Sequence, residues 1–306
     1  MDVSVIIPNY NHAPYLRQRI DSVLNQTFQD FEVIILDDCS TDGSKEIIET
    51  YASNPKISHI VINESNTGSP FLQWEKGLTL AKGKFIWVAE SDDWCEPTLL
   101  EVLLEGITQD PNCVLSYCQL YCVDDNEVIK WQSQHPRLSE MVDSKTFFND
   151  FLAVKVSVYN ASMAIFRKEA HEKISKDYTN FKFSGDQLFW AEIAMQGNIH
   201  ISGKLLNYFR KHEKDVSTGA YRSGLNFVEI LQIINWMYNR KLITERTYAA
   251  AFKKQFKAYW LVKNTIEPAN KKVISDLFSH PLTPKASMLK LLPTAVWNNF
   301  KNNKHD

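Results

Sequence analysis

The sequence predicts an α/β protein with a doubly wound, mostly parallel sheet flanked by helices and followed by a C-terminal helical extension. Short apolar runs rich in β-branched residues alternate with helical patterns through residues 1–110. Polar clusters follow these runs at their C-terminal ends, which is where ligands bind in sheets of this kind. Beyond Gly219 the pattern is helical.

Four strands are expected in the N-terminal part, each a short apolar run. The first, Val3–Pro8, stops at a turn cluster and is followed by a helix whose apolar residues extend from Tyr15 to Leu24. The second strand, 31–36, ends in Asp37 and Asp38. The further elements expected in order are a helix around Ile47 to Tyr51, a strand over 57–62, a loop over 63–70, a helix over 71–81 and a strand over 85–89.

From Cys113 the pattern changes to aromatic-rich alternation. Residues 114–123 and 128–131 are expected to form a hairpin around a turn at 124–126. The elements expected after the hairpin are a helix over 147–156, a strand over 162–166, a helix that begins at Asp186, and two amphipathic helices over 225–238 and 247–262. The last two are more typical of core packing than of a cofactor site.

Composition excludes several classes of protein. Lys and Arg total 34 against 36 Asp and Glu, a formal net charge of -2, which argues against a nucleic-acid partner. No basic leader precedes Val3 and no run is apolar enough to span a bilayer, so a cytoplasmic location is expected. An odd number of cysteines, 5, fits reduced thiols, and Cys113, Cys118 and Cys122 have no His at ligand spacing, which favours buried thiols over zinc.

An acidic cluster interrupts the fourth strand abruptly. Glu90, Ser91, Asp92 and Asp93 follow the apolar run FIWVA with no spacer. Adjacent carboxylates repel one another, so a cation such as Mg²⁺ or Mn²⁺, carrying a diphosphate, would explain the cluster. The alternative is a solvated turn in which Ser91 or Asp93 caps the next helix.

Two acidic clusters, Asp37/Asp38 and Asp92/Asp93, are expected at the same edge of the sheet, which favours a binding site over solvated turns. No glycine-rich phosphate-binding motif is present, so a phosphate-bearing ligand would depend on a metal and on carboxylates.

Three further segments have two interpretations each. Asp186 lies either at a helix N-cap or in a catalytic position. Arg210 and His212 are one residue apart, so in a strand they would share a face and meet a diphosphate, although a solvated basic loop fits as well. The tail 285–301 mixes Lys with Leu, Trp and Phe, which favours a packed helix over a peripheral contact with an anionic membrane.

At this point the motifs carry a resemblance to a known family. The chain resembles the family 2 inverting glycosyltransferases of the GT-A fold, of the type found in bacterial polysaccharide biosynthesis, over roughly its first two-thirds. The segments that carry the resemblance are VSVIIPNYN (3–11), SVLNQTFQDFEVIILDDCSTDGS (22–44), Asn66-x-Gly68, AKGKFIWVAESDD (81–93), SGDQLFW (184–190) and YFRKHEKDVS (208–217).

The resemblance implies a role for each matched residue. Asp186 would be the catalytic base, and Asp93 and His212 would hold the Mn²⁺ or Mg²⁺ that bridges the diphosphate. The residues implied to bind the nucleotide sugar are Pro8, Tyr10, Asn11, Asp38, Asn66, Gly68, Asp92 and Arg210. The substrates implied are a nucleotide sugar, with UDP as the expected nucleotide, and a glycan or lipid-linked acceptor. A peripheral contact of the tail would place the protein at the inner face of the membrane. The parts implied are a nucleotide-sugar-binding half (1–110), a metal- and acceptor-binding half (111–218) and the helical extension (219–306).

Three departures from the family pattern matter. The metal motif, taken as Ser91-Asp92-Asp93, has Ser in place of its first acid. Gly185 precedes Asp186 where many members have Glu, and Trp74 stands where many have an Arg that contacts the base. The first departure supports an alternative, a glycosyltransferase-like nucleotide- or glycan-binding module without catalysis. A sugar-phosphate nucleotidylyltransferase would need a glycine-rich loop where this chain has IIPNYNH.

Overall fold

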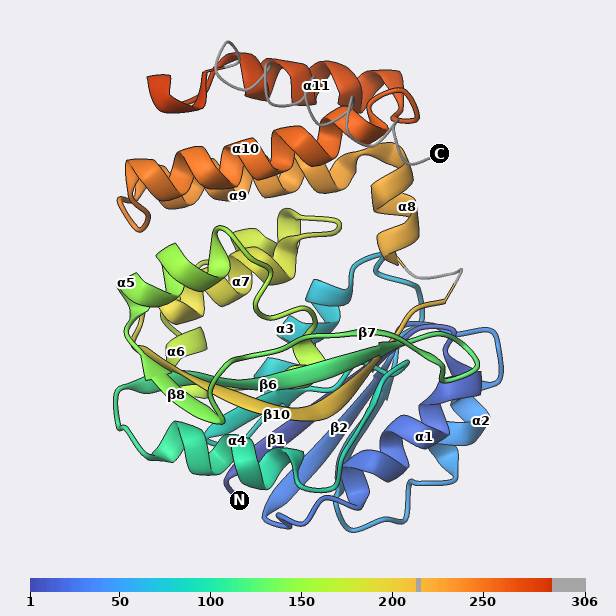
Figure 1. Cartoon of the computed structure of the whole chain (residues 1–306). Helices are drawn as coiled ribbons and strands as arrows, with labels where there is room; N and C mark the ends of the chain where they lie inside the picture. Colours follow the sequence, from blue (N-terminus) through green and yellow to red (C-terminus); the bar gives the residue numbers. More distant parts are fainter. Residues whose placement is uncertain (213–215, 288–306) are drawn as a thin grey trace. The chain divides into compact units, whose positions relative to one another are not determined.

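The computed structural model describes residues 1–212 and 216–287, and it contains a ten-stranded sheet (Figure 1). The strands follow the order β3 (Ile57–Ile62), β2 (Phe31–Asp37), β1 (Val3–Asn9), β4 (Phe85–Val88), β9 (Ala164–Arg167), β6 (Cys113–Val123), β10 (Asn198–Arg210) and β5 (Trp94–Cys95). Off this path, β7 (Ile129–Gln132) pairs with β6 and β8 (Ser139–Val142) pairs with β10.

The strands β1 to β4 are parallel to one another. β9 runs antiparallel to both β4 and β6, so β6 and its parallel partner β10 have the same direction as β4. The predicted mostly parallel sheet is confirmed. β1, β2 and β4 are buried along their whole length, which explains why they appear in the sequence as continuous apolar runs.

Helices cover both sides of the sheet. The helices that flank it are α1 (Ala13–Leu24), α2 (Ser44–Glu49), α3 (Pro70–Leu80), α4 (Leu99–Thr108) and α6 (Lys168–His171). Figure 1 shows α1 and α4 on one side and α3 on the other. Gly77 allows α3 to approach β1, because a Cβ atom at this position would lie 2.5 Å from Ile6 Cγ2.

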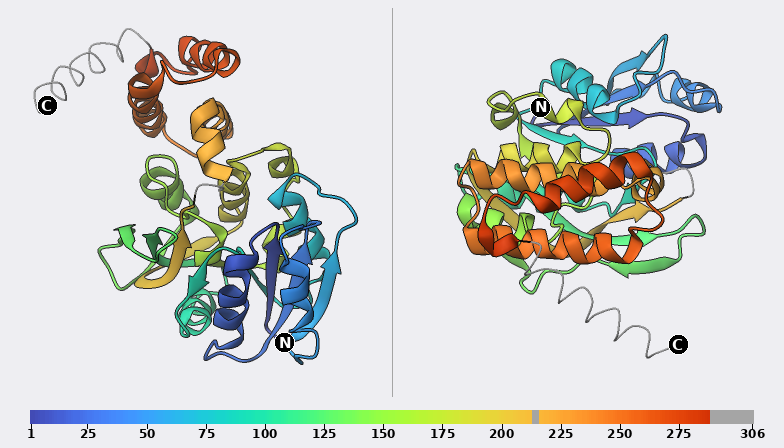
Figure 2. Two further views of the ribbon diagram at one scale, coloured as in Figure 1. Left: turned by 90° about the vertical axis from the view of Figure 1, so that its right-hand side faces the viewer. Right: turned by 90° about the horizontal axis from the view of Figure 1, so that it is seen from above.

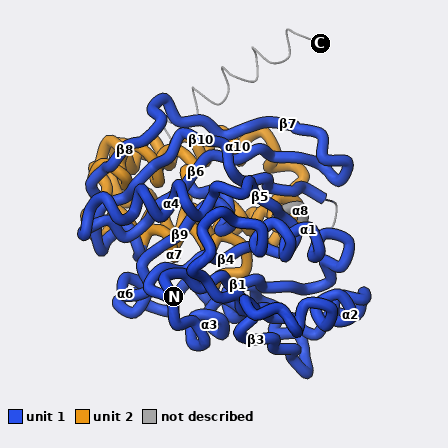
Figure 3. Tube along the Cα trace, turned by 90° about the horizontal axis from the view of Figure 1, so that it is seen from below, with its two compact units in different colours: residues 1–144, 158–180, 192–212 blue, residues 145–157, 181–191, 213–306 orange. Residues whose placement is uncertain are grey.

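The chain divides into two compact units (Figure 3). Unit 1 comprises residues 1–144, 158–180 and 192–212, and it contains the sheet. Unit 2 comprises residues 145–157, 181–191 and 213–306. The predicted division at residues 110 and 218 stays a prediction.

The C-terminal helical extension is present, as predicted. Its described elements are α8 (Val216–Ser223), α9 (Leu225–Asn239), α10 (Glu245–Val262), α11 (Pro268–Ser279) and the 3₁₀ turn η4 (Pro284–Ala286). Figures 1 and 2 show α9, α10 and α11 side by side. Aromatic side chains hold them together: the ring of Phe278 in α11 lies 5.2 Å and 5.1 Å from the rings of Phe252 and Phe256 in α10.

Several elements differ from the sequence expectation. The helix expected over 147–156 is a three-residue α5 (Ser144–Thr146) followed by a π-helix, η1 (Phe147–Leu152). The strand expected over 162–166 begins as the 3₁₀ turn η2 (Ala161–Met163) before β9. No helix of the described residues is long and apolar enough to cross a bilayer. The predicted membrane contact of the tail falls mainly on residues 288–306, outside the described residues.

Candidate metal and nucleotide site

The carboxyl ends of β1, β2 and β4 bring polar residues together at one edge of unit 1. Asn9 and Asp37 are paired in register at the ends of β1 and β2, and Asn9 Nδ2 donates a 2.7 Å hydrogen bond to Asp37 Oδ2. Asp37 Oδ1 accepts a hydrogen bond from Ser40 N at 2.8 Å. The side chains of Asn9 and Asp37 therefore form hydrogen bonds that join the ends of β1 and β2.

A candidate metal site lies in unit 1, built from three separate parts of its chain. The side chains of His12, Asp92 and His212 place one ligand atom each within 4.8 Å of one another. His212 Nε2 lies 3.2 Å from Asp92 Oδ2, and the rings of His12 and His212 are 5.4 Å apart. His12 Nδ1 is also 2.8 Å from Ser91 Oγ.

These donors fit a divalent transition metal. One carboxylate and two imidazoles offer oxygen and nitrogen ligands, and imidazole nitrogen suits Mn²⁺ better than it suits Mg²⁺. Burial acts to raise the pKa of Asp92, but the hydrogen bond from His212 and the charges of the two histidines outweigh it and lower that pKa. Asp92 therefore stays ionised, as a metal ligand must.

The neighbouring acids show why this part of the chain needs a cation. Burial and the charges of Asp92 and Asp93 raise the pKa of Glu90 to about 8. Burial and the charge of Asp92 raise the pKa of Asp93 to about 7. Three carboxylates in one buried cluster cannot all remain ionised without positive charge beside them.

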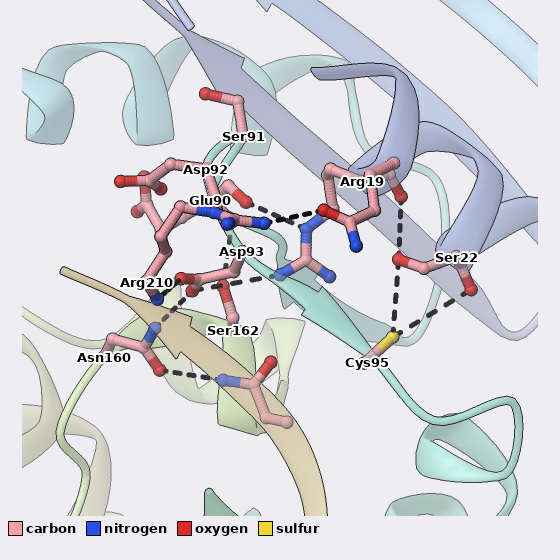
Figure 4. Close-up of polar contacts among 12 residues, drawn as sticks. Arg19, Ser22, Glu90, Ser91, Asp92, Asp93, Cys95, Asn160, Ser162 and Arg210 are labelled. Atoms are coloured by element: carbon pink, nitrogen blue, oxygen red, sulfur yellow. Dashed lines mark hydrogen bonds and ion pairs between the residues drawn. The ribbon is translucent and has the colours of Figure 1, made fainter. Parts of the chain in front are cut away.

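Asp93 is buried beside Arg19, Asn160 and Arg210. It is 1% exposed and accepts hydrogen bonds from Asn160 Nδ2 and from Arg210 N, the latter at 3.0 Å (Figure 4). Its Oδ2 lies 3.8 Å from Arg19 Nη2. The two histidines are thus grouped with Asp92 and not with Asp93, and the role of Asp93 as a metal ligand stays a prediction.

Arg19, which no sequence pattern singles out, places a buried positive charge beside the acidic cluster. It is fully buried in α1, its Nε donates to Glu90 O at 2.8 Å, and its guanidinium lies 5.8 Å from the Trp87 ring. Figure 4 shows it facing Glu90 and Asp93. No motif marks this residue, because its partners are about seventy positions away.

β10 ends at Arg210, so His212 lies just beyond the strand, but the two side chains contact the same residue. Both pack on Tyr15: the guanidinium of Arg210 lies 4.7 Å from its ring and the ring of His212 lies 5.4 Å from it. On its other side Arg210 lies 4.5 Å from the Trp94 ring, and its Nε donates to Asp92 O at 3.1 Å. Arg210 is thus buried against the rings of Tyr15 and Trp94, and its hydrogen bond to the backbone oxygen of Asp92 helps to hold that residue in place.

The predicted nucleotide-binding residues lie along the same edge. Asp38 is 4% exposed, and its carboxylate accepts hydrogen bonds from Asn63 Nδ2, Thr67 N and Gln73 Nε2 at 2.7, 3.0 and 2.9 Å. These contacts fasten the 63–68 loop to β2. The predicted contact between Asp38 and a base stays a prediction.

The other predicted nucleotide-binding residues differ in exposure. Pro8 is buried in β1, whereas Tyr10 is 47% exposed. Asn11 has a positive φ of 56°, and its Oδ1 accepts a hydrogen bond from Thr41 N at 2.8 Å. In the 63–68 loop, Asn66 accepts a hydrogen bond from the N–H of Gly68, whose φ of 71° suits glycine.

Trp74, in the position where many family members have Arg, contacts the acidic cluster. It is buried, and its Nε1 donates to Glu90 Oε1 at 3.0 Å. Because Glu90 is the first acid of the triplet Glu90-Ser91-Asp92, this spacing keeps an acid at both ends of an acid-x-acid motif. Which triplet forms the metal motif, Glu90-Ser91-Asp92 or Ser91-Asp92-Asp93, stays a prediction.

Asp186, the predicted base, belongs to unit 2. Helix α7 (Gly185–Ala194) begins one residue before it, so Asp186 lies in the first turn and not at the N-cap. Its Oδ1 accepts a 2.8 Å hydrogen bond from Gln187 N. Asp186 is half-buried, and burial, with the charge of Glu229 as a further cause, raises its pKa to about 7.

The sheet order and the acid-x-acid triplet at its edge are those of a GT-A fold. The family model described as glycosyl transferase family 2 matches residues 4–175, and the chain belongs to this family.

Curated relatives and solved structures agree with this membership. The chain is 36% identical over 115 residues to TuaG of Bacillus subtilis (strain 168), covering 38% of this chain and 45% of that protein. It is 28% identical over 248 residues to the poly(ribitol-phosphate) beta-N-acetylglucosaminyltransferase TarS of Staphylococcus aureus (strain Mu50 / ATCC 700699), covering 76% of this chain and 40% of that protein. The chain thus spans less than half the length of these relatives.

The crystal structure of S. aureus TarS 1-349 in complex with UDP-GlcNAc superimposes with a TM-score of 0.74 over 98% of this chain and 88% of that one, at 22% identity. A likeness at this identity supports the fold, and the predicted GT-A fold is confirmed.

Proposed function

We propose that this protein transfers a sugar from a UDP-sugar to a hydroxyl group of a glycan or lipid-linked acceptor, with inversion, in cell-surface polysaccharide synthesis. The observation that carries the proposal is the His12–Asp92–His212 cluster at the carboxyl edge of the sheet. The name of TarS and its complex with UDP-GlcNAc support UDP as the nucleotide and a surface polymer as the acceptor.

Asp92, His212 and His12 would hold Mn²⁺ or Mg²⁺, with Mn²⁺ favoured by the two imidazoles. Such an ion, when bound, neutralises the negative charge that develops on a leaving diphosphate. Arg19, whose Nη2 lies 3.8 Å from Asp93 Oδ2, offsets part of the remaining negative charge of the acidic cluster. If Asp93 were the metal ligand, as the resemblance implies, Asp92 would lie beside two histidines without a role.

The acceptor side requires a base, and Asp186 is proposed for it. The acceptor oxygen attacks the anomeric carbon on the face opposite the diphosphate, the bond from that carbon to the diphosphate oxygen breaks, and the anomeric centre inverts. The hydroxyl proton passes to the Asp186 carboxylate. A pKa of about 7 makes this carboxylate a stronger base than an ordinary Asp at the same pH.

The alternative of an inactive binding module loses its support. It rested on the absent first acid of the metal motif, and in the Glu90-Ser91-Asp92 register both terminal acids are present. We therefore keep transfer as the proposed function, with a cytoplasmic location and a peripheral membrane contact of the tail as further parts of the proposal.

The experiment is a thermal-shift measurement with UDP-GlcNAc, in Mn²⁺, in Mg²⁺ and in EDTA. Ligand that binds the folded state alone raises the unfolding temperature in proportion to the logarithm of its concentration over Kd. We expect stabilisation in Mn²⁺ and its loss in EDTA. Equal unfolding temperatures in all conditions, for UDP-GlcNAc and for UDP, would overturn the proposal of a UDP-sugar donor.

A further inference from the structure

Three consecutive backbone N–H groups before helix α7 converge on one carboxylate. Glu229 Oε1 accepts a hydrogen bond from Lys182 N at 2.8 Å. Glu229 Oε2 accepts hydrogen bonds from Phe183 N at 3.0 Å and from Ser184 N at 2.6 Å. Glu229 is 5% exposed, so these bonds are shielded from water.

The segment 181–184 belongs to neither a helix nor a strand, so no backbone ladder satisfies its N–H groups. A buried N–H without a partner costs about 1–3 kcal/mol, and hydrogen bonds to a charged acceptor are roughly twice as strong as neutral ones. Glu229 therefore takes the place of secondary structure here. Its own burial as a charge is made tolerable by the same three donors.

The fixed segment leads directly into Asp186. Ser184 is held at both ends of its backbone, because its N–H donates to Glu229 and its C=O accepts a 3.0 Å hydrogen bond from Gln187 N. Gly185 and Asp186 lie between Ser184 and Gln187, the two residues that the second hydrogen bond joins. The orientation in which Asp186 leaves the helix start is thus set by a residue more than forty positions later in the chain.

Glu229 stands on a rigid support. It lies in α9, a 15-residue helix whose neighbouring residues Phe227, Val228 and Leu231 are buried. α9 packs against α10 and α11 in the helical extension. These residues follow the 4–175 segment that the family model matches, so the support for Asp186 comes from outside that segment.

We propose that Glu229 is a positioning residue for Asp186, through which the helical extension holds the base in its working orientation. This inference rests on the proposed function, in which Asp186 takes the acceptor proton. Glu229 itself touches neither donor nor acceptor in this scheme. Its charge acts on Asp186 as well: after burial, the negative charge of Glu229 is the charged group that raises the pKa of Asp186.

The test replaces Glu229 with Gln, which keeps the shape but not the charge or the second acceptor oxygen. Glu229→Asp retains the charge on a shorter side chain. Glu245→Gln is the matched control, because Glu245 is also an acid of the helical extension and bonds Thr283 and Lys285. Thermal unfolding of each variant establishes that it is folded.

The first readout is hydrogen exchange of the amides of residues 182–187, which needs no substrate. We expect Glu229→Gln to speed exchange there at least about tenfold, since the amides lose a charged acceptor. Glu245→Gln should leave these amides unchanged. Unchanged exchange in a folded Glu229→Gln protein would overturn the inference that Glu229 holds the backbone of residues 182–184.

The second readout is UDP release from UDP-GlcNAc, resolved into kcat and KM. A base displaced by a fraction of an ångström to 1 Å is expected to cost about 10- to 100-fold in kcat, with KM for the donor within about twofold. Glu229→Asp should recover part of kcat. The acidic limb of the kcat profile should move to lower pH in Glu229→Gln, which a loss of folding would not produce.

Asp186→Asn separates the two proposals. If Asp186→Asn retains full turnover, the base assignment fails, whatever Glu229→Gln does. If Asp186→Asn is inactive and Glu229→Gln keeps full kcat, the positioning role fails and the base stands. In the double variant, Glu229→Gln should cost no further kcat, because its effect is transmitted through Asp186. A multiplicative loss in the double variant contradicts the inference.

Discussion

His212 Nε2 lies 3.2 Å from Asp92 Oδ2, and this contact joins the end of β10 to the acidic cluster that follows β4. It brings together residues 120 positions apart in the chain. The same contact decides which of two adjacent acids faces the candidate metal site. Asp92 meets His212 and His12, whereas Asp93 is occupied by Asn160, the backbone of Arg210 and Arg19.

Asp92→Asn is expected to remove the effect of Mn²⁺ on UDP binding. The amide carries no charge, so affinity in Mn²⁺ should fall at least about tenfold toward the value measured in EDTA. Isothermal titration calorimetry of UDP, in Mn²⁺ and in EDTA, measures both values.

Asp93→Asn is the matched control, being the same change one residue away. It should keep the Mn²⁺ dependence of UDP binding, and its effect should be on the unfolding temperature, because an amide replaces a buried carboxyl group that accepts hydrogen bonds from Asn160 and Arg210. Loss of the Mn²⁺ effect in Asp93→Asn with its retention in Asp92→Asn would restore Asp93 as the ligand.

Arg210→Lys is expected to act on stability more than on nucleotide affinity. Lysine cannot lie flat between the rings of Tyr15 and Trp94 or donate from a planar fork, so the free energy of unfolding should fall by about 1–3 kcal/mol. Chemical denaturation measures this loss. A protein of unchanged stability whose UDP affinity falls tenfold would show that Arg210 contacts the diphosphate, as the sequence motif predicts.

Glu75 gives a prediction on the pH dependence of stability. Burial acts to raise its pKa, but hydrogen bonds from His171, Lys176 and Tyr178 outweigh burial and lower that pKa from 4.5 to about 2. A lowered pKa in the folded state means that the ionised carboxylate stabilises the fold above about pH 4.5 and that this contribution is lost as pH falls toward 2.

Glu75→Gln should therefore be less stable than the wild type at pH 7, by about 3 kcal/mol at most, and the difference should shrink between pH 5 and pH 3. Urea denaturation at a series of pH values measures it. A difference that is constant across this range would mean that the ion pairs of Glu75 with His171 and Lys176 contribute nothing to stability.

Much of this fold is predictable because its strands and helices carry local patterns. β1, β2 and β4 are mainly apolar runs, β3 (ISHIVI) is more mixed, and all four agree with the predicted ranges to within one residue at each end. β5, with two residues, is too short to create a period, and the helix expected over 147–156 is present only as a shorter π-helix over 147–152. α7 begins at Gly185, before the N-cap that the sequence suggests at Asp186, because Ser, Gly and Asp all favour helix starts.

The candidate site is less predictable, because its contacts join distant segments. Adjacent acids such as Asp92 and Asp93 are equivalent in a motif, and only the backbone direction decides which one is exposed to a ligand. His12, Arg19 and Glu229 have no neighbouring residue in sequence that marks them. Their partners are 79, 71 and up to 47 positions away, so a single sequence carries no local signal for them.

The last prediction concerns Asp186→Asn, and it separates a base from a structural carboxylate. A base must be ionised to take a proton, and burial, followed by the charge of Glu229, raises the pKa of Asp186 to about 7. Turnover of the wild type should therefore rise with pH through about 7 and level off above it. Asparagine takes up no proton, so turnover should fall by about a hundredfold to ten-thousandfold while UDP-GlcNAc affinity stays within about twofold.

The stability of the protein should change with pH in the opposite direction to turnover. The pKa of Asp186 is higher in the folded than in the unfolded state, so the wild type loses stability as pH rises from about 4 to 7. Asp186→Asn has no such proton, so relative to the wild type it should be more stable at pH 8 than at pH 4. If Asp186 instead serves only the helix start, asparagine should preserve turnover at every pH and lower stability at pH 8, since it lacks the charge that favours a helix N-terminus. Turnover and unfolding temperature measured on the same samples at pH 5 and pH 8 distinguish the two cases.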